Sequence, residues 1–260
     1  MKRLISTLTL AALGSVGPSW GQMPAVNERG VANGHLHLNV RDVEANTKFF
    51  VNLGGTAPKD QPGVVEFPGV IVRLRKQDPT GGSVGSIVNH FGFLVPNVQQ
   101  YTTKWKAAGL NVEPGNNNRL DQAYLTTPDE VRVEILEDKS QTVPIKNHHV
   151  HFFVPEATIL EMQAWYGKTF GAKAGMRGQF QAADIPGVNL TWAKSDTAMA
   201  PTKGRALDHI GFEVKNLEAF CKKLEAGGMK LDRPYGKTPA GVGIAFITDP
   251  WGTQIELNEH

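Results

Sequence analysis

Histidine and glutamate recur at matching places along this chain. Four β-prone segments each begin with a histidine and reach a valine five positions later, namely His35–Val40, His90–Val95, His149–Val154 and His209–Val214. Two later β-prone segments each carry a glutamate six positions after a proline: Glu134 follows Pro128, and Glu256 follows Pro250. Neutral imidazole nitrogens and carboxylate oxygens are ligands that divalent transition metals accept. The pattern therefore points to metal chemistry.

The spacing groups these six residues into two similar sets. Glu134 lies 44 positions after His90, and Glu256 lies 47 positions after His209. A lone histidine on a strand is more often a solvent-facing or hydrogen-bonded residue, but that explanation is weak for six residues that repeat in register. We predict one site for Fe(II), Mn(II) or Zn(II) in each half, with positions left open for substrate, oxygen or water. The predicted ligands are His35, His90 and Glu134 in one half and His149, His209 and Glu256 in the other.

Two further histidines follow the first and third predicted ligands. His37 and His151 come two positions after His35 and His149, so the alternation of a strand places each pair on one face. The second and fourth segments have glycine at this position. His37 and His151 suit proton transfer in the pocket, and a hydrogen-bonded supporting role fits them equally well.

Four repeated βαβββ units would position these side chains. Each histidine segment is followed by a stretch with helical spacing of apolar residues and then by β-prone runs, of which the first is weakly marked. The first and third units share a Pro-Gly-Val turn, whereas the second and fourth share a Thr-Pro or Asp-Pro turn. This alternation predicts an α+β protein with two domains, at residues 33–138 and 147–258. It leaves open which unit pairs with which.

The fourth unit has the most specific sequence, Asp-His-Ile-Gly-Phe-Glu-Val followed by Asp249-Pro-Trp-Gly252 and Thr-Gln-Ile-Glu256. Together with the four-unit repeat, it resembles the vicinal oxygen chelate superfamily of glyoxalases, bleomycin resistance proteins and extradiol dioxygenases. The resemblance implies four βαβββ units paired into two cupped eight-stranded sheets. Each sheet would surround a metal ion that chelates vicinal oxygens of a small-molecule substrate.

The resemblance also orders the candidate reactions. Extradiol dioxygenases use two histidines and one glutamate, and they have a nearby histidine and tyrosine, of which only Tyr235 is present here. Glyoxalase-like members take a second glutamate from the last strand of the odd units, which here contain no carboxylate at Val70–Leu74 and Val188–Trp192. We therefore predict a dioxygenase-like metalloenzyme, with Tyr235 joining His37 and His151 as catalytic candidates. The alternatives are a glyoxalase-like lyase or isomerase, a non-catalytic ligand-binding protein, and a closed structural metal site.

Composition and the N-terminal residues bear on partners and location. The 27 basic and 25 acidic residues give a net charge of +2 without a basic cluster, which disfavours nucleic acid as a partner. Residues 1–21 read as a signal peptide, with Lys2 and Arg3 before an apolar run too short to span a bilayer permanently. We expect a periplasmic or secreted protein with no membrane association after signal removal, either monomeric or homodimeric. Its single cysteine, Cys221, forms no internal disulfide.

Overall fold

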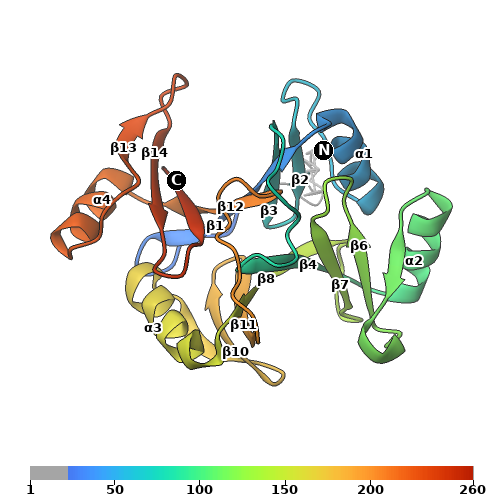
Figure 1. Ribbon diagram of the computed structural model, residues 1–260. Helices are drawn as coiled ribbons and strands as arrows, with labels where there is room; N and C mark the ends of the chain where they lie inside the picture. Colours follow the sequence, from blue (N-terminus) through green and yellow to red (C-terminus); the bar gives the residue numbers. More distant parts are fainter. Residues whose placement is uncertain (1–22, 260) are drawn as a thin grey trace, which may run out of the picture.

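The computed structural model describes residues 23–259, which form two mixed β-sheets with helices on their outer faces (Figure 1). This arrangement confirms the predicted α+β class and the repeated units. The predicted signal peptide at residues 1–21 lies outside the described residues. No helix in the described part is long and apolar enough to cross a membrane.

Each unit contributes one α-helix. Side-chain caps begin the first two, because Asp42 accepts from the Ala45 N–H and Asn97 from the Gln100 N–H. The α-helices are α1 (Val43–Leu53), α2 (Val98–Ala107), α3 (Ile159–Phe170) and α4 (Leu217–Ala226). Short 3-10 turns occur at Asn116–Asn118 and Glu156–Thr158.

Each sheet combines two units. The first sheet has the strand order β13 (Arg233–Lys237), β14 (Gly243–Thr248), β15 (Gln254–Glu259), β12 (Leu207–Val214), β1 (Val31–Val40), β3 (Val70–Lys76) and β2 (Val64–Phe67). The second sheet has the order β5 (Val112–Pro114), β6 (Gln122–Thr126), β7 (Arg132–Glu137), β4 (Val88–Val95), β8 (Lys146–Val154), β11 (Val188–Lys194), β10 (Phe180–Ile185) and β9 (Lys173–Arg177).

The pairing of units, which the sequence left open, is first with fourth and second with third. Strand β1 pairs antiparallel with β12 at the centre of the first sheet, and β4 pairs antiparallel with β8 at the centre of the second. Each sheet therefore takes strands from both predicted ranges, 33–138 and 147–258. These ranges describe the sequence repeat, while the sheets are built across them.

The first sheet has seven strands instead of the predicted eight. In the first unit, the strand that would match β9 is reduced to a single bridge between Thr56 and Glu66. Pro58 and Pro62 flank the following turn, and a proline has no N–H to donate to a strand ladder. The edge next to β2 therefore remains a loop.

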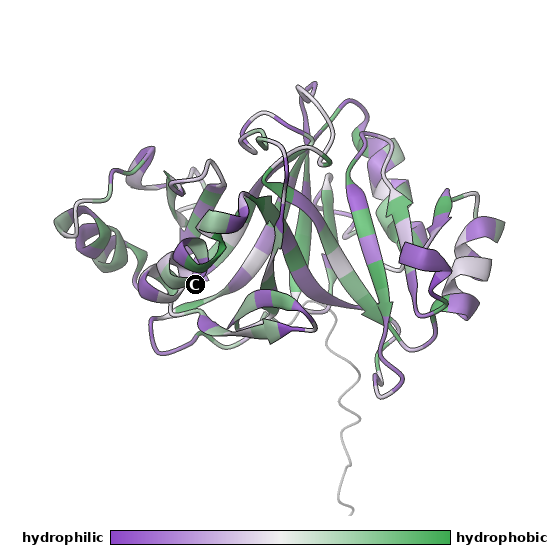
Figure 2. Ribbon diagram, turned by 60° about the horizontal axis from the view of Figure 1, so that its bottom comes forward, coloured by the Kyte–Doolittle hydropathy of each residue, from purple (hydrophilic) through white to green (hydrophobic). Residues whose placement is uncertain are grey.

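Helices α1 and α3 connect the two sheets through equivalent contacts. Phe50 of α1 stacks on Phe91 of β4, with ring centroids 6.4 Å apart, and Phe170 of α3 packs on Phe212 of β12 at 4.9 Å. Buried aliphatic and aromatic residues from both sheets form one continuous core. Hydrophobic and hydrophilic residues alternate along the central strands (Figure 2), which leaves one face of each sheet available for polar side chains.

Buried polar contacts reinforce these connections. The Asn46 side chain of α1 donates to Asp129, in the turn before β7, at 2.8 Å. The Tyr166 hydroxyl of α3 donates to Asp249, in the turn before β15, at 2.9 Å. Each helix is thus tied to a turn of the opposite sheet.

Candidate metal centres

The first sheet gathers three histidines and one glutamate on its polar face. Antiparallel pairing places His37 of β1 opposite His209 of β12 and places His35 opposite Gly211. Parallel pairing then aligns Gly211 with Glu256 of β15. In this first cluster, one possible ligand atom from each of His35, His37, His209 and Glu256 lies within 4.8 Å of all the others.

The second sheet repeats the arrangement. His90 of β4 lies opposite His151 of β8, and Gly92 lies between His149 on one side and Glu134 of β7 on the other. The second cluster consists of His90, Glu134, His149 and His151, again with ligand atoms within 4.8 Å of one another, and all four residues are buried.

All six predicted ligands therefore lie in the two clusters, but the predicted grouping by halves is wrong. His35 is grouped with His209 and Glu256, and His90 and Glu134 are grouped with His149. The reason is the pairing of β1 with β12 and of β4 with β8, which brings together histidines from opposite halves of the chain.

Glycine makes room for one imidazole in each cluster. A Cβ atom added at Gly92 would overlap the His149 ring, and one added at Gly211 would overlap the His35 ring. The missing side chains allow each ring to lie over the neighbouring strand. In the alignment of the four units, these two glycines occupy the position that His37 and His151 occupy in the first and third units. They are thus part of the site geometry.

Distances in the first cluster converge on the glutamate. Nε2 of His209 lies 2.7 Å from Oε2 of Glu256, and Nε2 of His35 lies 3.3 Å from the same oxygen. The His37 ring stacks on His209 at 4.3 Å. The Asn258 amide donates to the other oxygen of Glu256 at 2.9 Å, which fixes the carboxylate.

The second cluster converges in the same way. Nε2 of His149 and of His90 lie 2.8 and 3.2 Å from Oε2 of Glu134. Nδ1 of His151 lies 3.1 Å from Nε2 of His90. Gln122 donates to Oε1 of Glu134, and the Tyr124 hydroxyl lies 3.3 Å from that oxygen.

In each sheet a side-chain amide donates to the glutamate, but the amide comes from different strands of the equivalent strand pairs. Gln122 lies on β6 across from Leu136 of β7, whereas Asn258 lies on β15 across from Ile244 of β14. Each amide donates to Oε1 of its glutamate. The orientation of the carboxylate is therefore retained although the supporting residue has moved to the other strand.

Several buried imidazole nitrogens have no hydrogen-bond partner. Within the described residues they are Nδ1 of His35, both nitrogens of His37 and Nε2 of His151, whereas Nε2 of His35 and of His149 lie against their glutamate. Burying such atoms without partners is costly, and a metal ion would satisfy them. Ligands bound to one ion at about 2.0–2.2 Å lie at most roughly 4.4 Å apart, close to the observed spacing. The donor sets therefore fit a divalent metal.

The electrostatics match the protonation states that metal binding needs. Burial lowers the pKa of His149 to about 3 and that of His37 to about 3. Burial would raise the pKa of Glu134, but its contacts with His149 and His90 outweigh this effect and hold the pKa far below its usual range. The same balance lowers the pKa of Glu256. Neutral imidazoles and an ionised carboxylate result in the second cluster. In the first, burial would lower the pKa of His209, but its hydrogen bonds with Asp208 and Glu256 outweigh this effect and raise the pKa, so a metal ion there would displace a proton from His209.

A β-bulge beside each cluster supplies a second polar contact, which sequence reasoning missed. Asp208 and Asn89 interrupt the strand pairing just before His209 and His90. Oδ1 of Asp208 lies 2.6 Å from Nδ1 of His209, and Oδ1 of Asn89 lies 2.9 Å from Nδ1 of His90. Holding the proton on Nδ1 leaves Nε2 available to a metal. The only sequence signal was a polar residue before each histidine.

Comparison with known proteins supports this description. Residues 146–257 match the model of the Glyoxalase/Bleomycin resistance protein/Dioxygenase superfamily. Glyoxalase I from Zea mays has a similar structure, with a TM-score of 0.68 and 17% identity over 88% of this chain and 92% of the maize protein. A putative dioxygenase from Bacillus subtilis gives a TM-score of 0.61 and 14% identity, covering 92% of this chain and 86% of that one. No curated protein sequence matches.

The C-terminal part of the chain thus carries the sequence pattern of this superfamily. The family model covers the third and fourth units, and the similarity to solved structures extends the fold over the described chain. At these identities the solved structures show the fold, and the chemistry has to be inferred from the clusters themselves.

Of the three predicted catalytic residues, two lie in the clusters and one does not. His37 and His151 lie in the clusters as fourth donors beside the predicted ligands. Opposite them on β3 and β11 are Arg73 and Thr191, so the last strands of the odd units supply no carboxylate there. Tyr235 lies on edge strand β13, packs against the core and makes no hydrogen bond to either cluster within the described residues.

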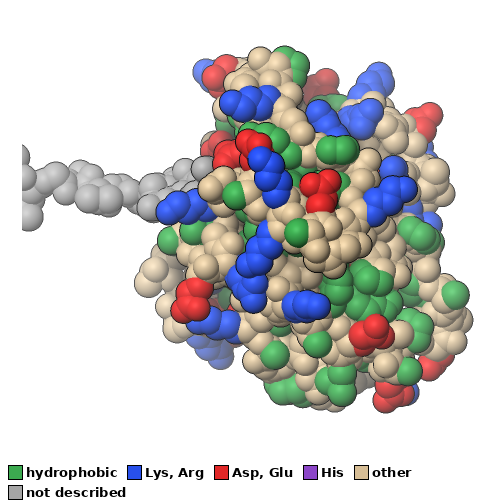
Figure 3. All heavy atoms as spheres, turned by 90° about the vertical axis from the view of Figure 1, so that its left-hand side faces the viewer, with side chains coloured by type: hydrophobic (Ala, Val, Ile, Leu, Met, Phe, Trp, Pro, Cys, Tyr) green, Lys and Arg blue, Asp and Glu red, His purple; other side chains and the backbone are tan. Residues whose placement is uncertain are grey.

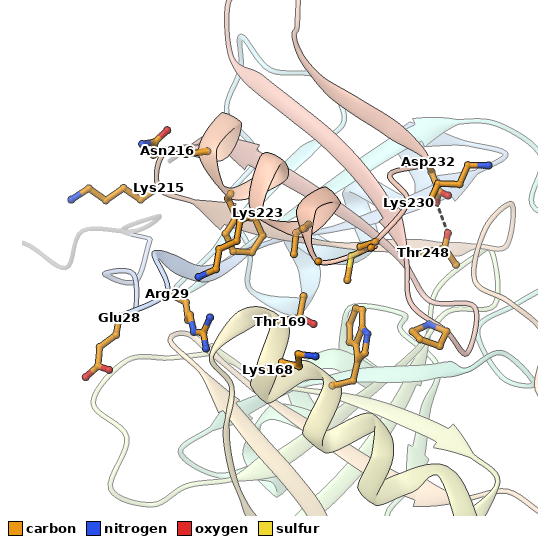
Figure 4. A pocket seen from close by; sticks show the side chains of 18 residues that line it. Glu28, Arg29, Lys168, Thr169, Lys215, Asn216, Lys223, Lys230, Asp232 and Thr248 are labelled. Atoms are coloured by element: carbon orange, nitrogen blue, oxygen red, sulfur yellow. Dashed lines mark hydrogen bonds between the residues drawn. The ribbon is translucent and has the colours of Figure 1, made fainter.

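A separate large cleft of about 940 Å³ lies between α3 and α4 and includes none of the cluster residues. Basic side chains line it, among them Arg29, Lys168 of α3 and Lys223 of α4 (Figure 4). Basic and hydrophobic side chains share this side of the molecule (Figure 3). The cleft is therefore distinct from the two candidate metal centres.

Proposed function

We propose that each cluster binds a divalent metal ion, Fe(II), Mn(II) or Zn(II), and that the protein is a metal-dependent enzyme. The proposed substrate is a small molecule that offers two vicinal oxygens, and the leading reaction is dioxygenase-like. The observation that supports this most directly is the pair of histidine–glutamate clusters, in which four buried imidazole nitrogens lack hydrogen-bond partners within the described residues. A bound ion would supply Lewis-acid chemistry and hold substrate oxygens.

In this proposal, the chain itself contributes orientation and proton control. Asp208 and Asn89 fix the ring orientation of His209 and His90, while Gln122 and Asn258 fix the glutamates. Such supporting contacts raise the precision of a metal site. The buried setting also excludes most water from the second cluster.

The role of the fourth histidine separates the two candidate reactions. In a dioxygenase-like site with two histidines and one glutamate, His37 and His151 remain free to accept or donate a proton. In a glyoxalase-like lyase or isomerase with four protein ligands, His37 and His151 take the place of the second glutamate. Four donors within 4.8 Å of one another support the glyoxalase-like lyase or isomerase as a second candidate that should be tested.

Metal analysis tests the proposal. Protein purified without chelator should contain two divalent ions per chain, and both Glu134→Gln and Glu256→Gln should lose one each. Oxygen uptake should follow addition of catechols or related enediols. Two ions per chain with a reaction that consumes no oxygen would support the lyase or isomerase. No metal in the wild-type protein would exclude both enzymes and favour a non-catalytic ligand-binding protein.

A His151→Ala variant distinguishes the two roles of the fourth histidine. If the ring is a proton-transfer group, the second cluster keeps its ion and turnover falls by about 10²–10⁴-fold. If the ring is a ligand, the metal affinity falls as well. His37→Ala provides the same comparison for the first cluster.

We further propose that the protein is exported to the periplasm or secreted, from the signal-peptide pattern at residues 1–21. Cell fractionation followed by N-terminal sequencing of the mature protein tests this, and cytoplasmic full-length protein would contradict it. Light scattering on the purified protein would decide between monomer and homodimer.

A further inference from the structure

Arg177 is a basic residue beside the second cluster that the proposed ligand set does not use. It is the last residue of β9, where it pairs with Phe180 of β10. Its Nε donates to Thr191 at 2.7 Å, and its Nη2 lies 3.4 Å from Nδ1 of His151. The contact with Thr191 aims the guanidinium at the cluster.

The guanidinium retains free hydrogen-bonding capacity. It has five N–H groups, and Thr191 and His151 account for two of them. Arg177 forms no ion pair within residues 23–259, and Glu134 is the acidic group that acts on it electrostatically. A half-buried, always-charged group with unused donors is suited to binding a carboxylate.

The side chain is also reachable. Arg177 lines a cleft of about 410 Å³ together with His148 and Asn189. Asp184 also lines this cleft, but it accepts a hydrogen bond from Asn189. A small ligand therefore has a path from solvent to the guanidinium.

In the described part of the chain, no basic residue reaches the first cluster from the position equivalent to Arg177. When the Pro-Gly-Val turns of the first and third units are superimposed in sequence, Arg177 corresponds to Lys59. Lys59 is exposed and lies in the loop that replaces the missing eighth strand. The extra strand of the second sheet is thus what delivers a cation to its cluster.

The charges near the two clusters differ accordingly. A divalent ion in the first cluster would be balanced by Glu256 and by Asp208, which contacts His209. In the second cluster it would meet one carboxylate, Glu134, and the cation Arg177, because the residue matching Asp208 is the neutral Asn89. Arg132 also acts on His90, but it is paired with Glu113. The exposed Arg73 near the first cluster is screened by water. The second cluster therefore carries an excess of positive charge.

We propose that the second cluster binds an anionic substrate, a small carboxylate with an oxygen on the adjacent carbon, and that Arg177 binds its carboxylate. This inference rests on the proposed metal binding and adds the substrate class. A carboxylate next to a carbonyl or hydroxyl supplies the two vicinal oxygens, and its second carboxylate oxygen faces the guanidinium. The first cluster prefers neutral ligands.

Calorimetric titration of the metal-loaded protein with pyruvate and with its neutral analogue pyruvamide tests the proposal. Pyruvate should bind at one site per chain and at least about tenfold more tightly than pyruvamide. Arg177→Gln should remove this preference, since loss of a hydrogen bond to a charged group costs about tenfold or more, and should lower the affinity for pyruvamide much less than that for pyruvate. Arg177→Lys should keep part of the preference, while the matched variant Lys59→Gln should behave as wild type.

Metal content measured on the same samples separates the two proposals. Two ions per chain with equal affinity for pyruvate and pyruvamide, or with an Arg177→Gln variant that still prefers pyruvate, would overturn the role of Arg177 alone. Absence of metal from the wild-type protein would overturn the proposed function, and the inference with it. Loss of the pyruvate site in Glu134→Gln, but not in Glu256→Gln, would locate the site at the second cluster.

Discussion

The two sheets carry the same set of side chains in different surroundings. Both present three histidines and one glutamate, in the same register on equivalent strands. Asp208 supports the first cluster, whereas the neutral Asn89 and the cation Arg177 lie beside the second. Duplication has thus preserved the histidines and the glutamate and altered the adjacent charges. The charges around a site, more than its ligands, distinguish the two.

The strongest test of this comparison concerns which histidines share a site. His149→Ala combined with His209→Ala should remove both metal ions, because the two residues lie in different clusters. His35→Ala combined with His209→Ala should remove only one. Elemental analysis gives the stoichiometry directly, and one ion remaining in the first double variant would restore the grouping by halves.

The next largest effect should come from adding a methyl group at the two glycines that make room for an imidazole ring. Gly92→Ala should displace His149 and lower metal occupancy of the second cluster, and Gly211→Ala should do the same to His35 and the first. Each should also cost about 1–3 kcal/mol of unfolding free energy, as overpacking does. Gly236→Ala, where an added Cβ meets no atom within 4 Å, is the matched control. Equal metal content in all three variants would argue against the tight fit.

Polar contacts on the two turns should differ in strength: Tyr166 donates to Asp249, and Arg41 forms an ion pair with Asp129. Tyr166→Phe leaves buried Asp249 with one donor fewer and should cost about 1–3 kcal/mol in denaturant unfolding. Arg41→Ala should cost about 0–1 kcal/mol, because the Arg41 side chain is 57% exposed and Asn46 still donates to Asp129. Similar losses in the two variants would contradict this ranking.

The smallest expected effect lies in the turns before β7 and β15. Glu130 has φ of 63° at the position where the fourth unit has Gly252, with φ of 104°. Because a side chain is strained in this region, Glu130→Gly should stabilise the protein by about 1 kcal/mol or less. Gly252→Ala should destabilise it. Thermal unfolding of the two variants measures both changes in stability. A loss of stability in Glu130→Gly would show that the turn tolerates the side chain.

Sequence periodicity was sufficient to predict the units and to select the six residues that meet in the two clusters, because strand alternation determines which side chains share a face. It was not sufficient for the grouping of ligands. Strands β1 and β8 carry histidines at equivalent positions, so either pairing of units would bring histidines together in register. The pairing of β1 with β12 and of β4 with β8 distinguishes the arrangements, and the contacts of α1 and α3 with the opposite sheets accompany it.

The other omissions have local causes. Asn89 and Asp208 reach the adjacent histidine because a bulge breaks strict alternation, which no simple strand pattern reveals. Arg177 belongs to Lys173–Arg177, a mostly exposed edge strand without an apolar pattern, so the sequence marked it only weakly. Tyr235 was assigned by resemblance alone. It lies on the edge strand β13 and forms no hydrogen bond with either cluster within the described residues.

The interleaved pairing of units has a consequence for how the molecule forms. The second sheet uses a continuous middle stretch of the chain, and the histidines His90 and His151 are separated by only 61 positions. The first sheet joins strands near both ends, from His35 to Glu256, so it requires nearly the whole described chain. Contacts between distant segments close more slowly than local ones. We expect the second sheet to fold while the last unit is still being synthesised. The first sheet, which needs strands from both ends of the chain, should form last.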